Sequence, residues 1–67
     1  MAIQLYSKEF WNYYGEWEKA ADVRNSVLSD VNEFFRWQDD VDIVEILEDW
    51  DDDDGCFTLV VYYKKYI

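Results

Sequence analysis

The chain contains no histidine and no proline, only one cysteine and only two glycines among its 67 residues. Without histidine it lacks the commonest general base of enzymes. Its single thiol, Cys56, can form neither an internal disulfide nor a structural zinc site. A glycine-rich phosphate-binding loop is also missing. These absences predict a protein that is not an enzyme and has no catalytic residues, no metal site and no cofactor.

The length of the chain predicts one domain, residues 1–67. A domain of this size buries only about 60% of the surface that its unfolded chain exposes, so its stability margin is thin. Because disulfides and zinc are excluded, stability must come from dense apolar packing or from a partner subunit. The hydrophobic fraction of 51% and the aromatic fraction of 21% supply that packing material and argue against disorder.

The sequence also lacks the marks of a membrane or exported protein. No uncharged apolar run approaches the ~18 residues of a membrane span, and residues 1–6 have no basic flank of the kind that signal peptides carry. A lone thiol is typical of a reducing compartment. We therefore expect a cytoplasmic protein that does not contact a membrane.

Hydrophobic periodicity predicts four regular elements: a short strand over residues 2–6, a helix over 17–37 and strands over 41–48 and 56–63. Residues 50–55 form a loop that ends in the turn pair Asp54-Gly55. The apolar stripe of the helix consists of Ala20, Val23, Val27, Val31, Phe34 and Phe35. Acidic residues in its first turn, Glu16 and Glu18, and Arg36 in its last turn complement the helix dipole.

The predicted fold class is therefore α+β, in the order β-α-β-β, with one amphipathic helix packed on a three-stranded antiparallel or mixed sheet. The last two strands form an antiparallel hairpin, and the helix provides a right-handed crossover from the first strand. Residues 8–15 are ambiguous. Ser7 is a helix cap or turn residue, and a short helical turn or an irregular aromatic loop is favoured over an extended strand, with Gly15 as a break.

One helix covers only one face of a sheet, and neither face of this sheet is cleanly polar. In the last strand, Phe57, Leu59, Val61 and Tyr63 alternate with Thr58, Val60 and Tyr62. In the strand before it, Ile43 and Leu47 are expected to oppose Val44 and Ile46. Either the aromatic segment 10–14 folds over the second face, or a second molecule does so in a symmetric homodimer.

The acidic residues are concentrated in one part of the chain. Ten lie within residues 39–54, and no basic residue lies between Arg36 and Lys64. Outside this window six acids balance six bases, so the whole formal net charge of −10 resides there. The predicted partner-binding residues are these ten acids and an aromatic anchor, Trp50: Asp39, Asp40, Asp42, Glu45, Glu48, Asp49, Asp51, Asp52, Asp53 and Asp54.

Two interpretations of this segment stay open. It is a solvated hairpin end whose charges keep an edge strand from aggregating, or it is a binding surface. Ten like charges repel one another and destabilise a small domain, and solubility needs far fewer. Such a surface is repelled by nucleic acid and by anionic lipid, which excludes both as direct ligands. A basic protein surface is the expected partner, with Trp50 packing against its arginines.

The small size, the acidity, the aromatic richness and the tract D-W-D-D-D-D-G (residues 49–55) resemble a class of phage proteins. These are the small acidic anti-defence proteins, including DNA-mimic anti-restriction and anti-CRISPR proteins. The resemblance implies an inhibitor that occupies the basic, nucleic-acid-binding surface of a partner protein. The alternative is a structural homo-oligomer whose acidic surface serves solubility.

The aspartate tract does not match a calcium-binding loop. In the frame that begins at Asp49, Asp54 falls at the glycine position and Val60 at the glutamate position. A weak, nonspecific divalent site stays open. No basic residue lies near Cys56 in the sequence to activate its thiol, so we expect a small apolar strand residue rather than a nucleophile.

Overall fold

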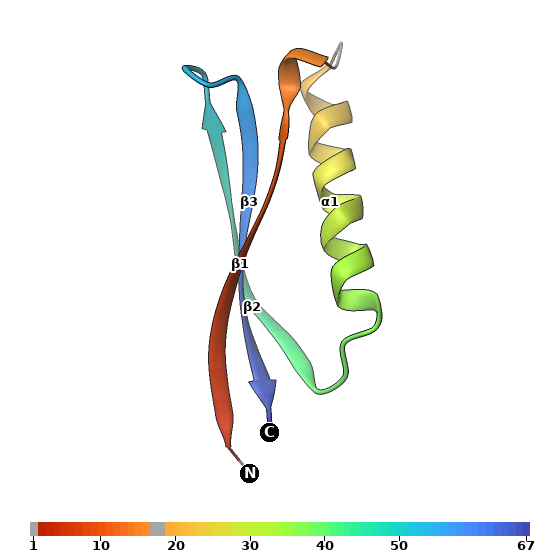
Figure 1. The fold of residues 1–67 in the computed structure, drawn as a ribbon, viewed down its shortest axis with the longest axis vertical. Coiled ribbons are helices and arrows are strands. Elements are labelled where there is room, and N and C mark those ends of the chain that lie inside the picture. The colour runs from red at the N-terminus through yellow and green to blue at the C-terminus, as the bar shows by residue number, and fades with distance from the viewer. Residues whose placement is uncertain (1, 17–18) are drawn as a thin grey trace.

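The computed structural model describes residues 2–16 and 19–67 and confirms an α+β fold with the order β-α-β-β. Within these residues, three antiparallel strands form one sheet in the order β1-β3-β2, and the helix α1 lies along one side of it (Figure 1). The elements are β1 (Ile3–Tyr13), the 3-10 helix η1 (Tyr14–Glu16), α1 (Ala20–Arg36), β2 (Val41–Asp51) and β3 (Cys56–Tyr66).

β3 is the central strand, and it pairs with β1 on one side and β2 on the other over its whole length. Its run of β-branched and aromatic residues suits a strand that has neighbours on both sides. Phe10 of β1 lies opposite Leu59, and Ile46 of β2 lies opposite Val61. Residues paired in this way point to the same face, so these registers decide which side chains of the outer strands meet the helix.

The aromatic segment after Ser7 is strand, which corrects the prediction of a helical turn or loop. β1 continues through Ser7 to Tyr13, and only residues 14–16 form a helical turn, which contains Gly15. The high strand propensity of the aromatic residues prevails because every position from 3 to 13 finds a partner position on β3. The segment 10–14 therefore does not fold over the second face of the sheet.

The strands are longer and the helix is shorter than predicted. β2 and β3 each extend three residues further, so Trp50 and Asp51 lie in a strand rather than in the loop. The helix begins at Ala20, with Asp22 as the acid in its first turn, and Arg36 lies in its last turn as predicted. Glu16 lies in η1. The predicted helical residues 17–18 are outside the described residues.

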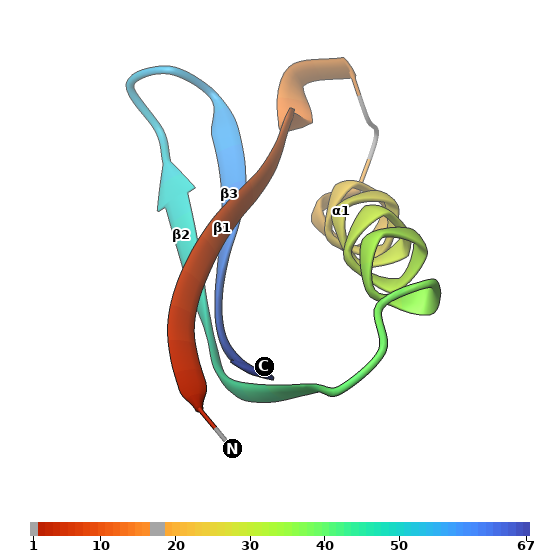
Figure 2. The same cartoon turned by 60° about the horizontal axis from the view of Figure 1, so that its bottom comes forward.

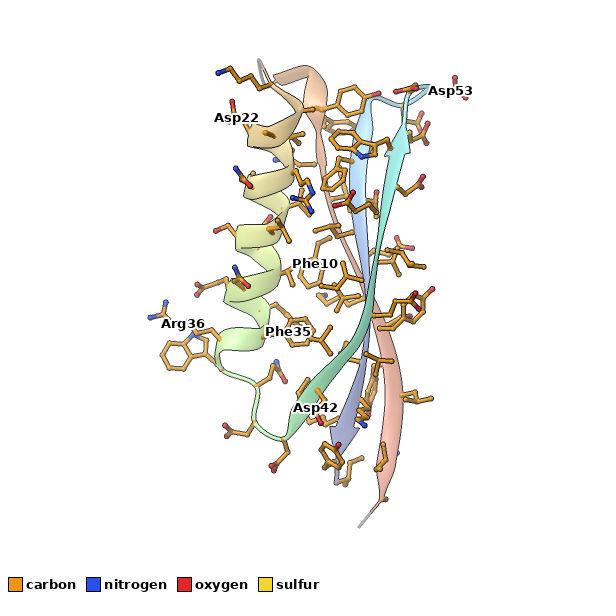
Figure 3. All side chains as sticks on the ribbon, turned by 180° about the vertical axis from the view of Figure 1, so that it is seen from behind. Phe10, Asp22, Phe35, Arg36, Asp42 and Asp53 are labelled. Carbon is orange, nitrogen blue, oxygen red and sulfur yellow. The ribbon has the colours of Figure 1, made fainter. Side chains whose placement is uncertain are left out.

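The hydrophobic core lies between α1 and the helix-facing side of the sheet. The helix contributes Val23, Val27 and Val31, which confirms the predicted stripe at these positions, whereas Ala20 is exposed. The sheet contributes Phe10, Phe57, Leu59 and Val61. Figure 3 shows Phe10 and Phe35 pointing into the space between the helix and the sheet.

An aromatic layer closes the core near the end of the helix. Phe34 meets Phe10 edge to face with ring centroids 5.5 Å apart, and Phe35 meets Tyr63 at 5.0 Å. Lys8, on the same side of β1, holds its ammonium 4.9 Å from the ring centre of Phe34. This cation–π contact lets an exposed, charged side chain lie against the margin of the core.

The other side of the sheet, which we call the open face, carries no second layer among the described residues (Figure 2). Its apolar side chains are accordingly in solvent. Leu5 is 79% exposed, Trp11 53% and Leu47 45%. The sequence predicted two partly apolar faces, and the structure leaves one of them uncovered.

We expect Leu59→Ala to lower the free energy of unfolding by about 3 kcal/mol, because Leu59 is buried at the centre of the only core in the described structure. That is a large part of the roughly 5 kcal/mol expected for so small a domain. Leu5→Ala makes the same chemical change on the open face and should cost less than about 0.5 kcal/mol. Urea denaturation measures both. Equal losses would show that Leu5 is buried in solution, as in a homodimer.

Candidate functional site

The ten predicted carboxylates lie on β2 and on the turns at its two ends, and we call this set the acidic edge. β2 is an outer strand of the sheet because only β3 pairs with it. Asp42 and Asp53 lie near opposite ends of this edge (Figure 3). The charges thus follow much of the longest dimension of the molecule, which measures 45 Å.

A β-bulge at Val44 determines where these side chains point. The register with β3 shifts between Ile43 and Glu45, so the alternation of the strand changes phase. After the shift, Glu45, Asp49 and Asp51 lie opposite open-face residues of β3. Without the extra residue, all three would point toward the helix. The bulge therefore keeps three carboxylates out of the core.

The same shift corrects the predicted facing of the apolar residues in this strand. Ile43 and Ile46 both lie on the helix side, opposite Tyr63 and Val61, whereas Leu47 lies on the open face opposite Val60. The sequence prediction paired Ile43 with Leu47 because it assumed strict alternation.

Four of the ten carboxylates are engaged by other groups of the chain. Glu48 pairs with Arg24 of the helix at 2.5 Å. Asp42 accepts a hydrogen bond from the Tyr66 hydroxyl at 2.7 Å.

The other two engaged carboxylates shape the β2–β3 turn. Asp51 accepts hydrogen bonds from the backbone N–H groups of Asp53 and Asp54, at 3.1 and 3.2 Å. This use of an aspartate is typical of tight turns. Asp52 accepts a hydrogen bond from the Tyr14 hydroxyl at 2.8 Å and so ties η1 to the turn. Gly55, with φ of +66°, completes the turn in a conformation that favours glycine.

The remaining six carboxylates have no side-chain hydrogen bond or ion pair within residues 2–16 and 19–67, and all six are exposed. They are Asp39, Asp40, Glu45, Asp49, Asp53 and Asp54. Asp40 also has a backbone role, because it adopts a left-handed conformation and its carbonyl accepts the N–H of Tyr66 at 2.9 Å. These six are the part of the acidic edge that is free to meet another molecule.

Trp50 is less available as an anchor than the sequence predicted. It lies on the helix side of β2, with its ring 4.3 Å from that of Phe57 and 5.7 Å from that of Tyr14, centre to centre. It remains 39% exposed. Its main contacts are therefore with the core, which it covers at the end next to the β2–β3 turn.

A hollow that the sequence analysis missed lies on the open face beside this turn. It has a volume of about 440 Å³ and is lined by Trp11, Tyr13, Asp54 and Cys56. Trp11 and Tyr13 share a face because they are two positions apart on a strand, and their rings meet edge to face at 5.2 Å. The alternation W-N-Y at residues 11–13 was the available signal, but it identifies this face only if the segment is read as strand.

The site has few features of a catalytic or metal centre. The Cys56 thiol lies 3.7 Å from the Thr58 hydroxyl and 3.9 Å from the Phe57 carbonyl oxygen, which are not basic groups that would activate it. In the part of the chain that is described, no three acidic or thiol side chains gather in a metal-binding arrangement.

No helix within the described residues has the length and apolar character needed to cross a membrane.

No family model, no curated protein and no solved structure matches the chain.

The hydrogen bond from Tyr14 to Asp52 raises the pKa of the Tyr14 hydroxyl to about 12, with smaller contributions from burial and from the charges of Asp52, Asp51 and Asp53. Ionisation of Tyr14 would place a negative charge beside carboxylates and remove the donor that holds η1 to the turn. The hydrogen bond that connects η1 to the β2–β3 turn therefore requires a protonated Tyr14.

This shift predicts how stability depends on pH at the alkaline end. The folded chain keeps the Tyr14 proton to about pH 12, whereas an unperturbed tyrosine loses it near pH 10. The stabilising contribution is therefore complete below pH 10 and is lost as the pH rises toward 12. Denaturation at both pH values should show a smaller decline for Tyr14→Phe than for the unmodified chain. A spectrophotometric titration in which the variant retains the late-ionising tyrosine would contradict the assignment.

Proposed function

We propose that this chain is a non-enzymatic acidic binding protein that occupies the basic, nucleic-acid-binding surface of a partner protein. The main support for the proposal is the set of six exposed carboxylates that have no side-chain partner among the described residues and lie on an outer strand and its turns. Glu48 and Asp51 have partners that serve the fold, whereas the side chains of these six acids are left to contact solvent or another molecule. The resemblance to phage anti-defence proteins suggests an inhibitor that acts in the cytoplasm of a bacterial host.

The spacing of the charges supports this proposal. β2 has 11 residues and is therefore roughly 34 Å long. With the turns at its ends, the acidic edge carries a carboxylate about every 4 Å, and one strand of B-DNA carries a phosphate about every 3.4 Å. A groove lined with lysine and arginine to hold a DNA strand thus meets a similar density of negative charge on this edge.

The rigidity of the acidic edge also supports it. The β2–β3 turn is held by Asp51 from within and by Tyr14 from η1, and the Tyr14 N–H also donates to the Gly55 carbonyl at 2.9 Å. A pre-organised charged surface loses little conformational entropy on binding. The charges at this end of the acidic edge are therefore presented on a hydrogen-bonded turn rather than on a tail.

A structural homo-oligomer is the second candidate, and the uncovered open face favours it. Leaving a large apolar side chain in water forfeits roughly 1.5–3 kcal/mol relative to burying it, and Leu5, Trp11 and Tyr13 are all about half exposed or more.

Sedimentation equilibrium in low and high salt separates the candidates. A hydrophobic dimer strengthens as salt rises, whereas binding by the acidic edge weakens.

The proposal predicts binding that is sensitive to salt and to the acidic edge. Immobilised protein should retain nucleic-acid-binding proteins from a bacterial lysate, and competing duplex DNA should release them. Their binding should weaken steeply above ~0.15 M salt, where exposed charges are screened over about 8 Å.

Paired charge-neutralising variants test which acids are responsible. Asp49→Asn with Asp53→Asn should slow association with a purified captured protein several-fold. Asp30→Asn with Glu33→Gln removes two charges from the helix instead and serves as the control. Equal effects of the two pairs, measured by surface plasmon resonance, would mean that only net charge matters and that the acidic edge is not the binding surface.

A further inference from the structure

The hollow beside the β2–β3 turn combines two features that lie together on the open face. Two aromatic rings, those of Trp11 and Tyr13, stand nearly perpendicular to each other, with an interplanar angle of 78°. Asp54, one of the six free carboxylates, lines the same hollow. Aromatic faces attract cations through the ring quadrupole, and a neighbouring carboxylate adds a full opposite charge. Both features favour a cationic ligand.

We propose that this hollow binds an arginine side chain presented by the basic partner. This inference rests on the proposed function, because it requires a partner with a basic surface. It extends that function by assigning one specific contact, made by Trp11, Tyr13 and Asp54, beside the general attraction of the acidic edge. None of the aromatic residues involved belongs to the acidic segment.

The shape of the hollow favours the end of a side chain over a free small molecule. Pockets for small molecules enclose most of the ligand surface. This hollow has a volume of about 440 Å³ but is lined by four of the described residues, at the margin of a sheet face that is itself exposed. A side chain anchored on a partner protein does not need to be enclosed, because the partner covers the remaining side.

Guanidinium suits this site better than the ammonium of lysine. It is planar and stacks on an aromatic ring while its N–H groups bond a carboxylate in the same plane. It is also more weakly hydrated than ammonium, so moving it into a half-open hollow costs less desolvation.

A second copy of this chain is a poor source of that arginine. Both arginines are already engaged on their own surface: Arg24 pairs with Glu48 at 2.5 Å, and Arg36 lies over the ring of Trp37 at 5.2 Å and near Glu33 at 3.8 Å. Each copy also carries a formal net charge of −10. A basic partner supplies free arginines and is attracted by the same charge.

Alkylation of Cys56 reports whether the hollow is occupied, because Cys56 lines the hollow and is the only thiol in the chain. The probes are three Gly/Ser peptides that are identical except for one position, which holds arginine, lysine or trimethyl-lysine. NMR titration should show that the arginine peptide shifts the Trp11 indole signal and binds about two- to fivefold more tightly than the lysine peptide. Saturating arginine peptide should also slow alkylation of Cys56 by iodoacetamide.

Variants on the exposed face test the contacts without disturbing the core. Trp11→Leu should abolish the preference for arginine over lysine, whereas Trp37→Leu, which removes an even more exposed tryptophan outside the hollow, should preserve it. Asp54→Asn should weaken binding more than Asp53→Asn, its neighbour in the turn. Circular dichroism establishes that each variant is folded, and the alkylation assay needs no variant.

The possible failures are distinguishable. If arginine and lysine peptides bind equally, and Trp11→Leu changes nothing, the hollow is not an arginine site, but attraction of basic peptides by the acidic edge still supports the proposed function. A preference for trimethyl-lysine over arginine would overturn the guanidinium assignment. If an oligolysine peptide does not bind even at low salt, the proposed function fails as well.

Discussion

The pairing of β3 with both neighbours along its whole length is the constraint on which the rest of this structure depends. Among the described residues, the core consists of seven buried side chains, three of which come from β3 itself. The outer strands contribute only Phe10 to that core, so backbone hydrogen bonds to β3 are what hold them in place. Because β2 contributes few side chains to the core, five of its eleven side chains can be carboxylates.

The acidic edge and the fold are compatible because of where the charges are placed. An outer strand exposes its side chains to water on several sides, which screens repulsion between carboxylates. The bulge at Val44 then turns Glu45, Asp49 and Asp51 away from the core at the cost of one unpaired position. β2, which carries much of the net charge of the molecule, thus still places Ile46 and Trp50 on the helix side of the sheet.

Much of the architecture was predictable from sequence, since periodicity identified the helix, its three buried valines and the β2–β3 hairpin. The secondary structure of residues 8–13 was not predictable, because their aromatic residues are compatible with helix, loop and strand. Pairing with β3, which the local sequence does not show, decides in favour of strand. The bulge left a trace in the spacing of Asp42, Ile43, Glu45 and Ile46, where the acidic and apolar positions change phase. Composition identified the ten carboxylates, but only the fold separates the four that are engaged from the six that are free. The hollow could be found only with residues 8–13 assigned as strand, since it joins β1 to the turn.

Lys8, held against the rings of Phe10 and Phe34, has a consequence for how the sheet ends. β1 is an outer strand with 11 residues. The unpaired backbone groups of a long outer strand can pair with strands of other molecules. Two copies that joined antiparallel through the middle of β1 would bring their Lys8 side chains opposite each other on the helix side, where directly opposed like charges are destabilising. A charged side chain on an outer strand is a known safeguard against fibril-like growth. The two outer strands of this small sheet thus carry opposite charges that oppose edge-to-edge association, carboxylates along β2 and one lysine on β1.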